Sequence, residues 1–344
     1  MKAKKVIALF LSLSMFLLAL AGCGTSSNDA NSKSSEDPIV ISIAHTDSSN
    51  RSTNECGIWL NDYLQKETNG KVAVEMYPDG QLGDDPDLAA GVKLGNVTIY
   101  FGLASVISSI VGEKASCVDL PYLYSTYDEW VQGTFENGGL ELFNEALEGS
   151  GYTCLDMMYN GMRCVASSKK IYHNSDDLKG QKVRIAQNDL NVKLWQSMGA
   201  NPTPMAWGEV ITSLSQGTVD ALDHSLGVFN DFNIHEIAPY VTVTNHCSSP
   251  YPVICSTEWL NSLDDETREK VVDGVHQMCE KQRVMERENE LSYLERFEQE
   301  GATVYTLSAQ EQEALKEAVK PVYKEWRKRV GDDVIDAWLA TVPQ

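Results

Sequence analysis

Two arginines near the middle of the chain have the side chain best suited to bind a small anion. Arg184 ends a short apolar segment, and Arg163 follows the turn signal Asn160-Gly161. A guanidinium presents two parallel N–H groups that match both oxygens of a carboxylate, whereas lysine offers only a point charge. Residue type alone leaves other roles open. Arg184 could be a surface residue at a strand end, and Arg163 could pair with an internal acid.

Several other residues could shape a site around such an anion. Trp207 could cover a sugar ring or an aliphatic chain, or it could belong to the core. Asp223 and His224 follow an apolar segment, and a carboxylate facing a cleft accepts hydrogen bonds from hydroxyl groups. Gln187 could contact a ligand or cap a helix.

Motifs of the common enzyme classes are missing from the sequence. It contains no H-E-x-x-H, G-x-S-x-G or G-x-x-x-x-G-K, and its eight cysteines include no C-x-x-C pair. We therefore expect a binding protein rather than an enzyme, with no catalytic residue, metal or cofactor. Buried thiols are the favoured interpretation of the cysteines other than Cys23.

The N-terminus predicts export and a lipid anchor. Three lysines precede an apolar run, 6–20, that ends in Leu-Ala-Gly before Cys23. This pattern is typical of a lipoprotein signal peptide, 1–22, with Cys23 carrying the lipid; the alternative is an ordinary signal peptide. Residues 23–37 are polar, as in a flexible tether. We expect an extracytoplasmic protein held on the cell membrane, in the periplasm or on the outer face of the cytoplasmic membrane.

The net charge restricts the possible partners. The formal charge is −21, and it becomes −24 once the three lysines of the signal segment are removed. Such a protein does not bind nucleic acid through electrostatics, and an anionic ligand needs a local positive group.

Hydrophobic patterning predicts two α/β units and a long helix. The first unit has strands at 39–44, 71–77 and 97–101, with helices at 54–67 and from Asp85-Pro86 to Gly95. The second unit begins with two strands, 152–158 and 162–167, and has further strands at 183–186 and 219–222 and helices at 189–198 and 209–216. Ligands of parallel α/β units bind beyond the carboxyl ends of the strands, so two units suggest a cleft between lobes. The charged segment 264–299 predicts a helix that bridges the lobes, or a coiled coil, and helices at 309–330 and 332–340 follow.

Short motifs spread along the chain resemble one family. They are 68–72 (TNGKV), 77–83 (YPDGQLG), 119–123 (DLPYL), 177–184 (DLKGQKVR), 199–205 (GANPTPM) and 216–220 (QGTVD). In this order they resemble the solute-binding proteins of TRAP (tripartite ATP-independent periplasmic) transporters, which are DctP-like. The resemblance covers nearly all of the chain after residue 37.

The resemblance implies an α/β, two-lobe periplasmic-binding-protein-like fold, with mixed sheets flanked by helices and a long helix spanning both lobes. Lobe I is expected at 38–160 and 250–289, and lobe II at 161–249 and 290–344. A monomer of this kind delivers a small organic acid to the membrane subunits of a transporter driven by an ion gradient. A sensory protein that presents its ligand to a receptor is the alternative.

The resemblance also implies roles for individual residues. Arg184 matches the arginine that pairs with the ligand carboxylate, Arg163 a second arginine nearby, and Trp207 an aromatic residue against the ligand. At 221–225 the chain has ALDHS in place of a Gly-x-Glu-Asn-Pro-like run, so Asp223 and His224 change the donors. The remaining positions that match ligand-contacting sites are Gln187, His45, Asn50 and Ser105.

The expected ligand is a hydroxylated monoacid such as a uronate or an aldonate. A C4-dicarboxylate or a keto or hydroxy acid is the alternative. Leu103 replaces the acidic residue of sialic-acid binders, which argues against sialate.

Overall fold

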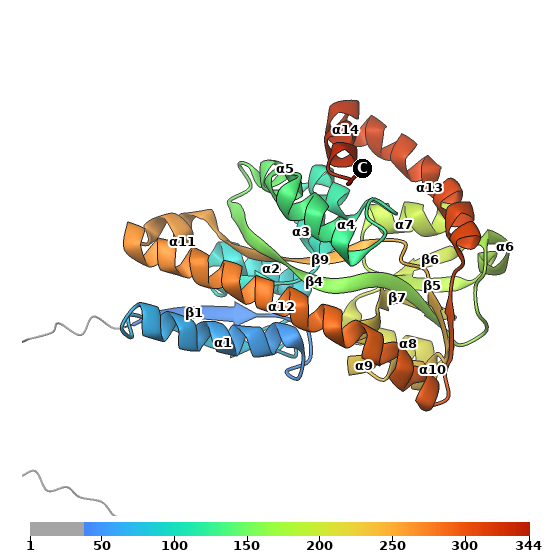
Figure 1. Ribbon diagram of the computed structural model, residues 1–344, viewed down its shortest axis with the longest axis horizontal. Helices are drawn as coiled ribbons and strands as arrows, with labels where there is room; N and C mark the ends of the chain where they lie inside the picture. Colours follow the sequence, from blue (N-terminus) through green and yellow to red (C-terminus); the bar gives the residue numbers. More distant parts are fainter. Residues whose placement is uncertain (1–37) are drawn as a thin grey trace, which may run out of the picture. The chain divides into compact units, whose positions relative to one another are not determined.

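The computed structural model describes residues 38–344 (Figure 1). The predicted signal segment, the lipidation site Cys23 and the tether lie outside these residues. Within the described part, no helix is both long and apolar enough to cross a membrane.

The first α/β unit has the predicted order of strands and helices. Strand β1 (Ile39–Ala44) pairs in parallel with β2 (Val72–Tyr77) and with β3 (Ile99–Phe101). Helices α1 (Ser52–Glu67) and α2 (Asp85–Leu94) connect them. Gly95 ends α2 with a φ of 77°, a left-handed conformation that favours glycine.

A helical region after β3 has no counterpart among the sequence predictions. Its apolar side chains join the largest core cluster. Its elements are α3 (Ala104–Val111), η1 (Glu113–Asp119), α4 (Tyr127–Val131), η2 (Gln132–Glu136) and α5 (Gly139–Leu147).

Strand β4 (Tyr152–Ser167) corrects the prediction of two strands separated by a turn. It is one continuous strand that pairs with β9 (Ser248–Ser256), with irregular register between Tyr159 and Met162. Gly161 has a φ of 92° there, so Asn160-Gly161 makes a bulge rather than a reversal. The chain thus continues from one half of the sheet into the other.

The sheet order is β2-β1-β3-β9-β4-β7-β5-β6. We call the strands from β2 to β9 the first half and those from β7 to β6, with β8 and β10, the second half; β4 belongs to both. The strands of the second half are β5 (Lys182–Ile185), β6 (Asn201–Pro204), β7 (Ala221–Ser225), β8 (Tyr240–Val243) and β10 (Thr303–Thr306).

Short helices flank the second half. These helices are α6 (Ser175–Leu178), α7 (Asp189–Ser197), η3 (Trp207–Glu209), α8 (Val210–Ser215), α9 (Leu226–Asp231) and α10 (Ile234–Ile237). Two of them, α7 and α8, agree with the predicted helices 189–198 and 209–216.

Helix α12 (Asp265–Gln299), which follows α11 (Thr257–Ser262), connects the two halves. It packs on α1, β4, α9 and β10. Figure 1 shows it reaching from α1, beside the first half, to α9 and α10 beside the second. The prediction of a long bridging helix is therefore confirmed.

The two last helices also match their predicted ranges. Helix α13 (Ala309–Val330) packs on α7, and α14 (Asp332–Ala340) packs on η1 and α5. The C-terminal segment therefore packs on helices that precede β4 (η1 and α5) as well as on α7, which follows β5, whereas the sequence analysis placed this segment in lobe II. The lobe boundaries themselves stay a prediction.

Candidate functional site

A cavity of about 260 Å³ lies between the first half of the sheet and the second. We call it the Arg184 cavity. The loops after β1 and β3 and the start of α2 contribute one wall, and β5, β7 and the segment before α8 contribute another. Among its lining residues are five that the sequence analysis selected: Ser105, Arg184, Gln187, Trp207 and His224.

Arg184 is a buried cation without a carboxylate partner. It is 3% exposed, and its Nη2 donates to the backbone oxygen of Met205 at 2.7 Å. Its Nε and Nη1 are buried and have no hydrogen-bond partner among residues 38–344. Burial is the main cause that lowers the pKa of Arg184 to about 10, and the positive charge of the nearby Arg163 is the second cause. The Arg184 side chain is therefore still positive at neutral pH. Its two unpaired N–H groups fit an anion in the cavity.

Arg163 and Asp223 form an internal pair instead of lining the cavity. Arg163 Nε donates to Asp223 Oδ1 at 2.8 Å, and Nη2 donates to the backbone oxygen of Asp223 at 2.9 Å. Asp223 also accepts from Trp195 Nε1 at 2.8 Å and is fully buried. Burial would raise the pKa of Asp223, but Arg163 and His246 hold it below its usual value. The expectation that Asp223 faces the cleft is therefore not met, because its oxygens turn to these internal donors.

His224 can donate one hydrogen bond into the cavity. Its Nδ1 accepts from the backbone N–H of Ser225 at 2.9 Å. Burial and the charges of Arg163 and Arg184 hold its pKa well below 6.5, so the ring is neutral. With Nδ1 as acceptor, the hydrogen must lie on Nε2.

Trp207 belongs to an aromatic group on the wall near Arg184. Its ring contacts His224 edge-on at 5.3 Å and Phe232 at 4.9 Å. The Arg184 guanidinium lies 5.4 Å from the Trp207 ring centroid. Trp207 is half-buried, so part of the ring is available to pack against a ligand.

The first half of the sheet brings carboxylates to the same cavity, which the sequence analysis missed. They are Asp47, Asp84, Asp85 and Asp87. Asp85 Oδ1 accepts from Tyr100 at 2.9 Å and Thr46 at 3.0 Å. Burial raises the pKa of Asp85 to about 6 despite these hydrogen bonds. In the sequence, Asp85-Pro86 predicts only a helix start, and nothing local indicates that this helix starts beside Arg184.

A family model matches residues 43–329, and its description is bacterial extracellular solute-binding protein, family 7, DctP. The chain belongs to this family. The resemblance to TRAP solute-binding proteins is thereby confirmed, and the family and fold are those of transport binding proteins rather than enzymes.

Relatives and solved structures of family 7 are similar over most of their length. The 2,3-diketo-L-gulonate-binding periplasmic protein YiaO of Escherichia coli is 25% identical over 330 residues, covering 96% of this chain and 94% of YiaO. The C4-dicarboxylate-binding periplasmic protein DctP of Rhodobacter capsulatus is 26% identical, and the match covers 90% of this chain and 92% of that protein. The crystal structure of the sugar acid binding protein DctPAm of Advenella mimigardefordensis, in complex with galactonate, matches with a TM-score of 0.83 at 24% identity. The match covers 88% of this chain and 97% of DctPAm.

Two positions matched to ligand-contacting sites of family 7 do not line the Arg184 cavity. His45 is fully buried and stacks on Phe101 with ring centroids 6.0 Å apart. Asn50 is exposed on the loop before α1. Ligand contacts of these residues, and of Arg163, stay predictions.

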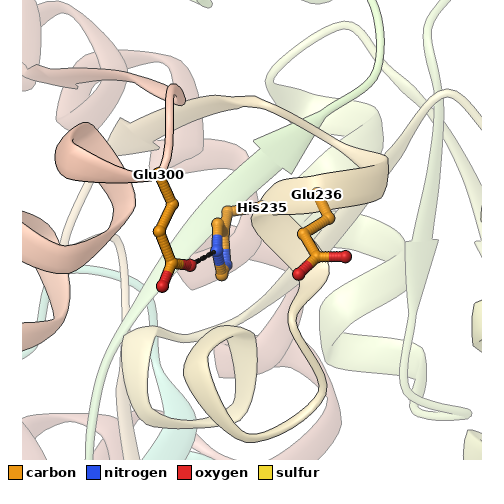
Figure 2. Close-up of side chains that lie close together, drawn as sticks. All are labelled: His235, Glu236 and Glu300. Carbon is orange, nitrogen blue, oxygen red and sulfur yellow. Dashed lines mark hydrogen bonds and ion pairs between the residues drawn. The ribbon is translucent and has the colours of Figure 1, made fainter.

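One group elsewhere has the side chains to hold a metal ion. Figure 2 shows His235 between the carboxylates of Glu236 and Glu300, with ligand atoms within 4.8 Å of one another. Glu300 bonds His235 Nε2 and also accepts from Arg296 Nε at 3.0 Å. The Glu300 carboxylate thus already contacts two side chains of the protein, and it lies at the end of α12.

Proposed function

We propose that this family 7 protein captures a small hydroxylated monocarboxylate, such as a uronate or an aldonate, in the Arg184 cavity. It then delivers this ligand to the membrane subunits of a TRAP transporter. The observation that carries the proposal is the buried, unpaired Nε and Nη1 of Arg184 on the cavity wall. A ligand carboxylate can accept a hydrogen bond from these N–H groups and supplies the counter-charge that the buried guanidinium lacks.

The charge distribution favours one carboxylate rather than two. Among the described residues that line the cavity, Arg184 is the only positively charged one, because His224 is neutral. The first half contributes Asp47 and Asp85 instead. Asp47 is paired with Arg51, but Asp85 accepts only from hydroxyl groups of the described residues. A second ligand carboxylate about 4 Å from Asp85 would be repelled by roughly 4 kcal/mol at an effective dielectric constant of about 20. Ligand hydroxyl groups can donate to the same carboxylates.

Similar folds alone do not select the ligand. Solved structures with this fold hold galactonate in the protein from Advenella mimigardefordensis and succinate in the protein from Sulfurospirillum deleyianum. The carboxylates on the first-half wall support the hydroxylated monoacid. Trp207 supports it as well, because the accessible part of its half-buried ring can cover the apolar face of a sugar.

Titration calorimetry with D-galacturonate, D-glucuronate, D-galactonate, D-erythronate and succinate tests the proposal. We expect micromolar or tighter binding of a hydroxylated monoacid, about −8 kcal/mol, and binding of succinate that is at least tenfold weaker. Tightest binding of succinate, or binding of none of the five, would contradict the ligand class.

The role of Arg184 has its own test. Arg184→Met should weaken binding of the preferred acid by about 100-fold or more, since it removes a buried charge-assisted pair. Arg327→Met is the matched control and should leave affinity unchanged, because Arg327 on α13 pairs with Asp336 and does not line the cavity. Equal affinities of the Arg184 variant and the wild type would remove Arg184 from the site.

We also propose that the mature protein is held on the membrane by a lipid on Cys23. The pattern of residues 1–23 supports this. Cys23→Ser should move the protein from the membrane fraction to the soluble fraction of expressing cells. A wild-type N-terminal peptide without added lipid mass would contradict the proposal.

A further inference from the structure

Arg51 is a second buried arginine with an unusual set of partners. Its side chain is 1% exposed at the start of α1. Nη1 donates to Asp47 at 3.2 Å, and Nη2 donates to Asn160 at 2.6 Å and to Glu286 at 3.1 Å. Nε lies 3.5 Å from Asp231 Oδ2. One guanidinium is thus shared by three carboxylates and an amide.

These partners come from both halves of the sheet and from the elements between them. Asp47 lies after β1, in the first half, and Asp231 ends α9, after β7 in the second half. Asn160 lies at the bulge of β4, and Glu286 lies on α12, which contacts both halves. Arg51 therefore sits where the two halves meet.

The partners of Arg51 also reach both walls of the Arg184 cavity. Asp47 lines the cavity itself. On the other side, Asn160 Oδ1 accepts from Ser225 Oγ at 3.2 Å, and the backbone N–H of Ser225 donates to His224 Nδ1 at 2.9 Å. A movement that separates the halves must break the contact of Arg51 with Asp231, because Arg51 and Asp47 both lie between β1 and α1 in the first half.

The approach of α9 to this guanidinium depends on a glycine. A Cβ on Gly227 would lie 2.6 Å from Arg51 Nη2 and 2.4 Å from Glu286 Oε1, which is closer than atoms can pack. Gly227 lies inside a helix, where alanine is normally the better residue by about 1 kcal/mol. The glycine at this position fits a requirement for close approach rather than for helix formation.

We propose that Arg51 is a positioning residue that holds the two halves closed around the ligand through its shared contacts with Asp47, Glu286 and Asp231. This inference rests on the proposed function of the Arg184 cavity. Arg51 does not line the cavity, so it acts on ligand retention through the arrangement of the walls. Its loss should therefore accelerate ligand dissociation more than it slows association.

Stopped-flow tryptophan fluorescence with D-galacturonate and D-galactonate tests the proposal. We expect Arg51→Met to raise the dissociation rate tenfold or more and Asp231→Asn to raise it about threefold, with association rates within about threefold of the wild type. Arg51→Lys should recover part of the loss. Gly227→Ala should act in the same direction as Arg51→Met, against its helix propensity. Lys281→Met, an exposed cation on α12, is the control.

An effect of Arg51 on ligand retention must be distinguished from a loss of folding. Dissociation rates are therefore measured only for variants that keep the wild-type circular dichroism at the assay temperature. Because Arg51→Met leaves three carboxylates without their cation and could fail to fold, Asp231→Asn is the second variant. Dissociation rates within twofold of the wild type for a folded Arg51→Met, or for Asp231→Asn if Arg51→Met does not fold, would overturn the proposal.

Failure of the proposed ligand class is distinguishable from failure of this inference. If the wild type binds neither these two acids nor D-glucuronate or D-erythronate, the ligand class is wrong, and small-angle X-ray scattering of the ligand-free proteins still tests Arg51. We expect Asp231→Asn to have a larger radius of gyration than the wild type. Equal radii would overturn the role of Arg51 in closure.

Discussion

Arg163 and Arg184 are both buried and lie near each other, but their partners differ. Arg163 has the Asp223 carboxylate at 2.8 Å, whereas Arg184 has only a backbone oxygen and two unpaired N–H groups. Burying a charge is costly unless it is paired, so Arg184 carries a cost that a bound anion would offset. The same residue type is thus paired internally at one position, and at the other it is left for the binding role that we propose.

Stability measurements distinguish these two roles. In the ligand-free protein, Arg184→Met should raise the free energy of unfolding by about 1–3 kcal/mol, because it removes buried unpaired donors. Arg163→Met should lower it by about 3–5 kcal/mol, because Asp223 loses its counter-charge. Urea unfolding at pH 7.5 measures both changes. Changes of the same sign would contradict the assignment.

Asp85 should make stability depend on pH. Its pKa in the folded protein is about 6, above the unfolded value of about 3.8. The folded protein therefore holds this proton more tightly, and the contribution to stability is lost as the pH rises from about 4 to 6. In Asp85→Asn no carboxyl group titrates at this position, so this loss of stability with rising pH is absent.

We expect the stability of Asp85→Asn relative to the wild type to rise by about 1–2 kcal/mol between pH 4 and pH 7.5. A fully buried carboxyl would give more, but this side chain is partly accessible to water. Denaturant unfolding at both pH values is the measurement. Other buried acids, such as Asp119, are present in both proteins, so their pH-dependent contributions to stability cancel when the two proteins are compared. A difference that does not change with pH would contradict the raised pKa.

At the scale of elements, α12 completes the hydrogen bonds of the bulged strand β4. The Gln282 amide on α12 is fully buried, and its Oε1 accepts from the backbone N–H of Tyr159 at 2.9 Å. Its Nε2 donates to the Tyr159 backbone oxygen at 2.9 Å. A side chain thus pairs with a residue at the bulge, where the strand register shifts.

Gln282→Leu should therefore destabilise the protein by about 2–4 kcal/mol, since two buried backbone groups lose their partner. Asn289→Leu is a matched control, because Asn289 is an exposed amide on the same helix, and its effect should lie within about 0.5 kcal/mol. Thermal or urea unfolding compares the two variants. Equal effects would show that the contact with Tyr159 contributes little.

At the scale of the whole molecule, the net charge of −21 opposes the approach of an anionic ligand. Arg184 attracts the ligand only at short range inside the cavity. Salt screens the long-range repulsion, since the Debye length falls from about 30 Å at 0.01 M to about 8 Å at 0.15 M ionic strength.

Raising the ionic strength over this range should therefore increase the association rate of D-galacturonate by about twofold to threefold. The dissociation rate should change little, because the buried contact with Arg184 is weakly screened. Stopped-flow fluorescence at several salt concentrations measures both rates. An association rate that falls with salt would mean that local positive charge dominates the approach.

Local patterns of the sequence determined many regular elements of this protein, but not the helices between β3 and β4 or the continuity of β4. The 3.6-residue and two-residue periodicities and the glycine stops predicted β1, α1, α12 and α13 nearly to the residue. The order of several family motifs also predicted Arg184, Trp207 and His224 as cavity residues, and each of these lines the cavity. Both kinds of signal are contained in short stretches of the chain.

Only the tertiary structure decided which buried charges are paired. Asp223 meets Arg163 because β4 and β7 are neighbours in the sheet, and Asp85 reaches the cavity because the two halves of the fold face each other. These neighbours are far apart in the sequence. Whether a carboxylate neutralises an arginine or faces a ligand depends on a few ångströms between such segments, and no local pattern encodes that distance.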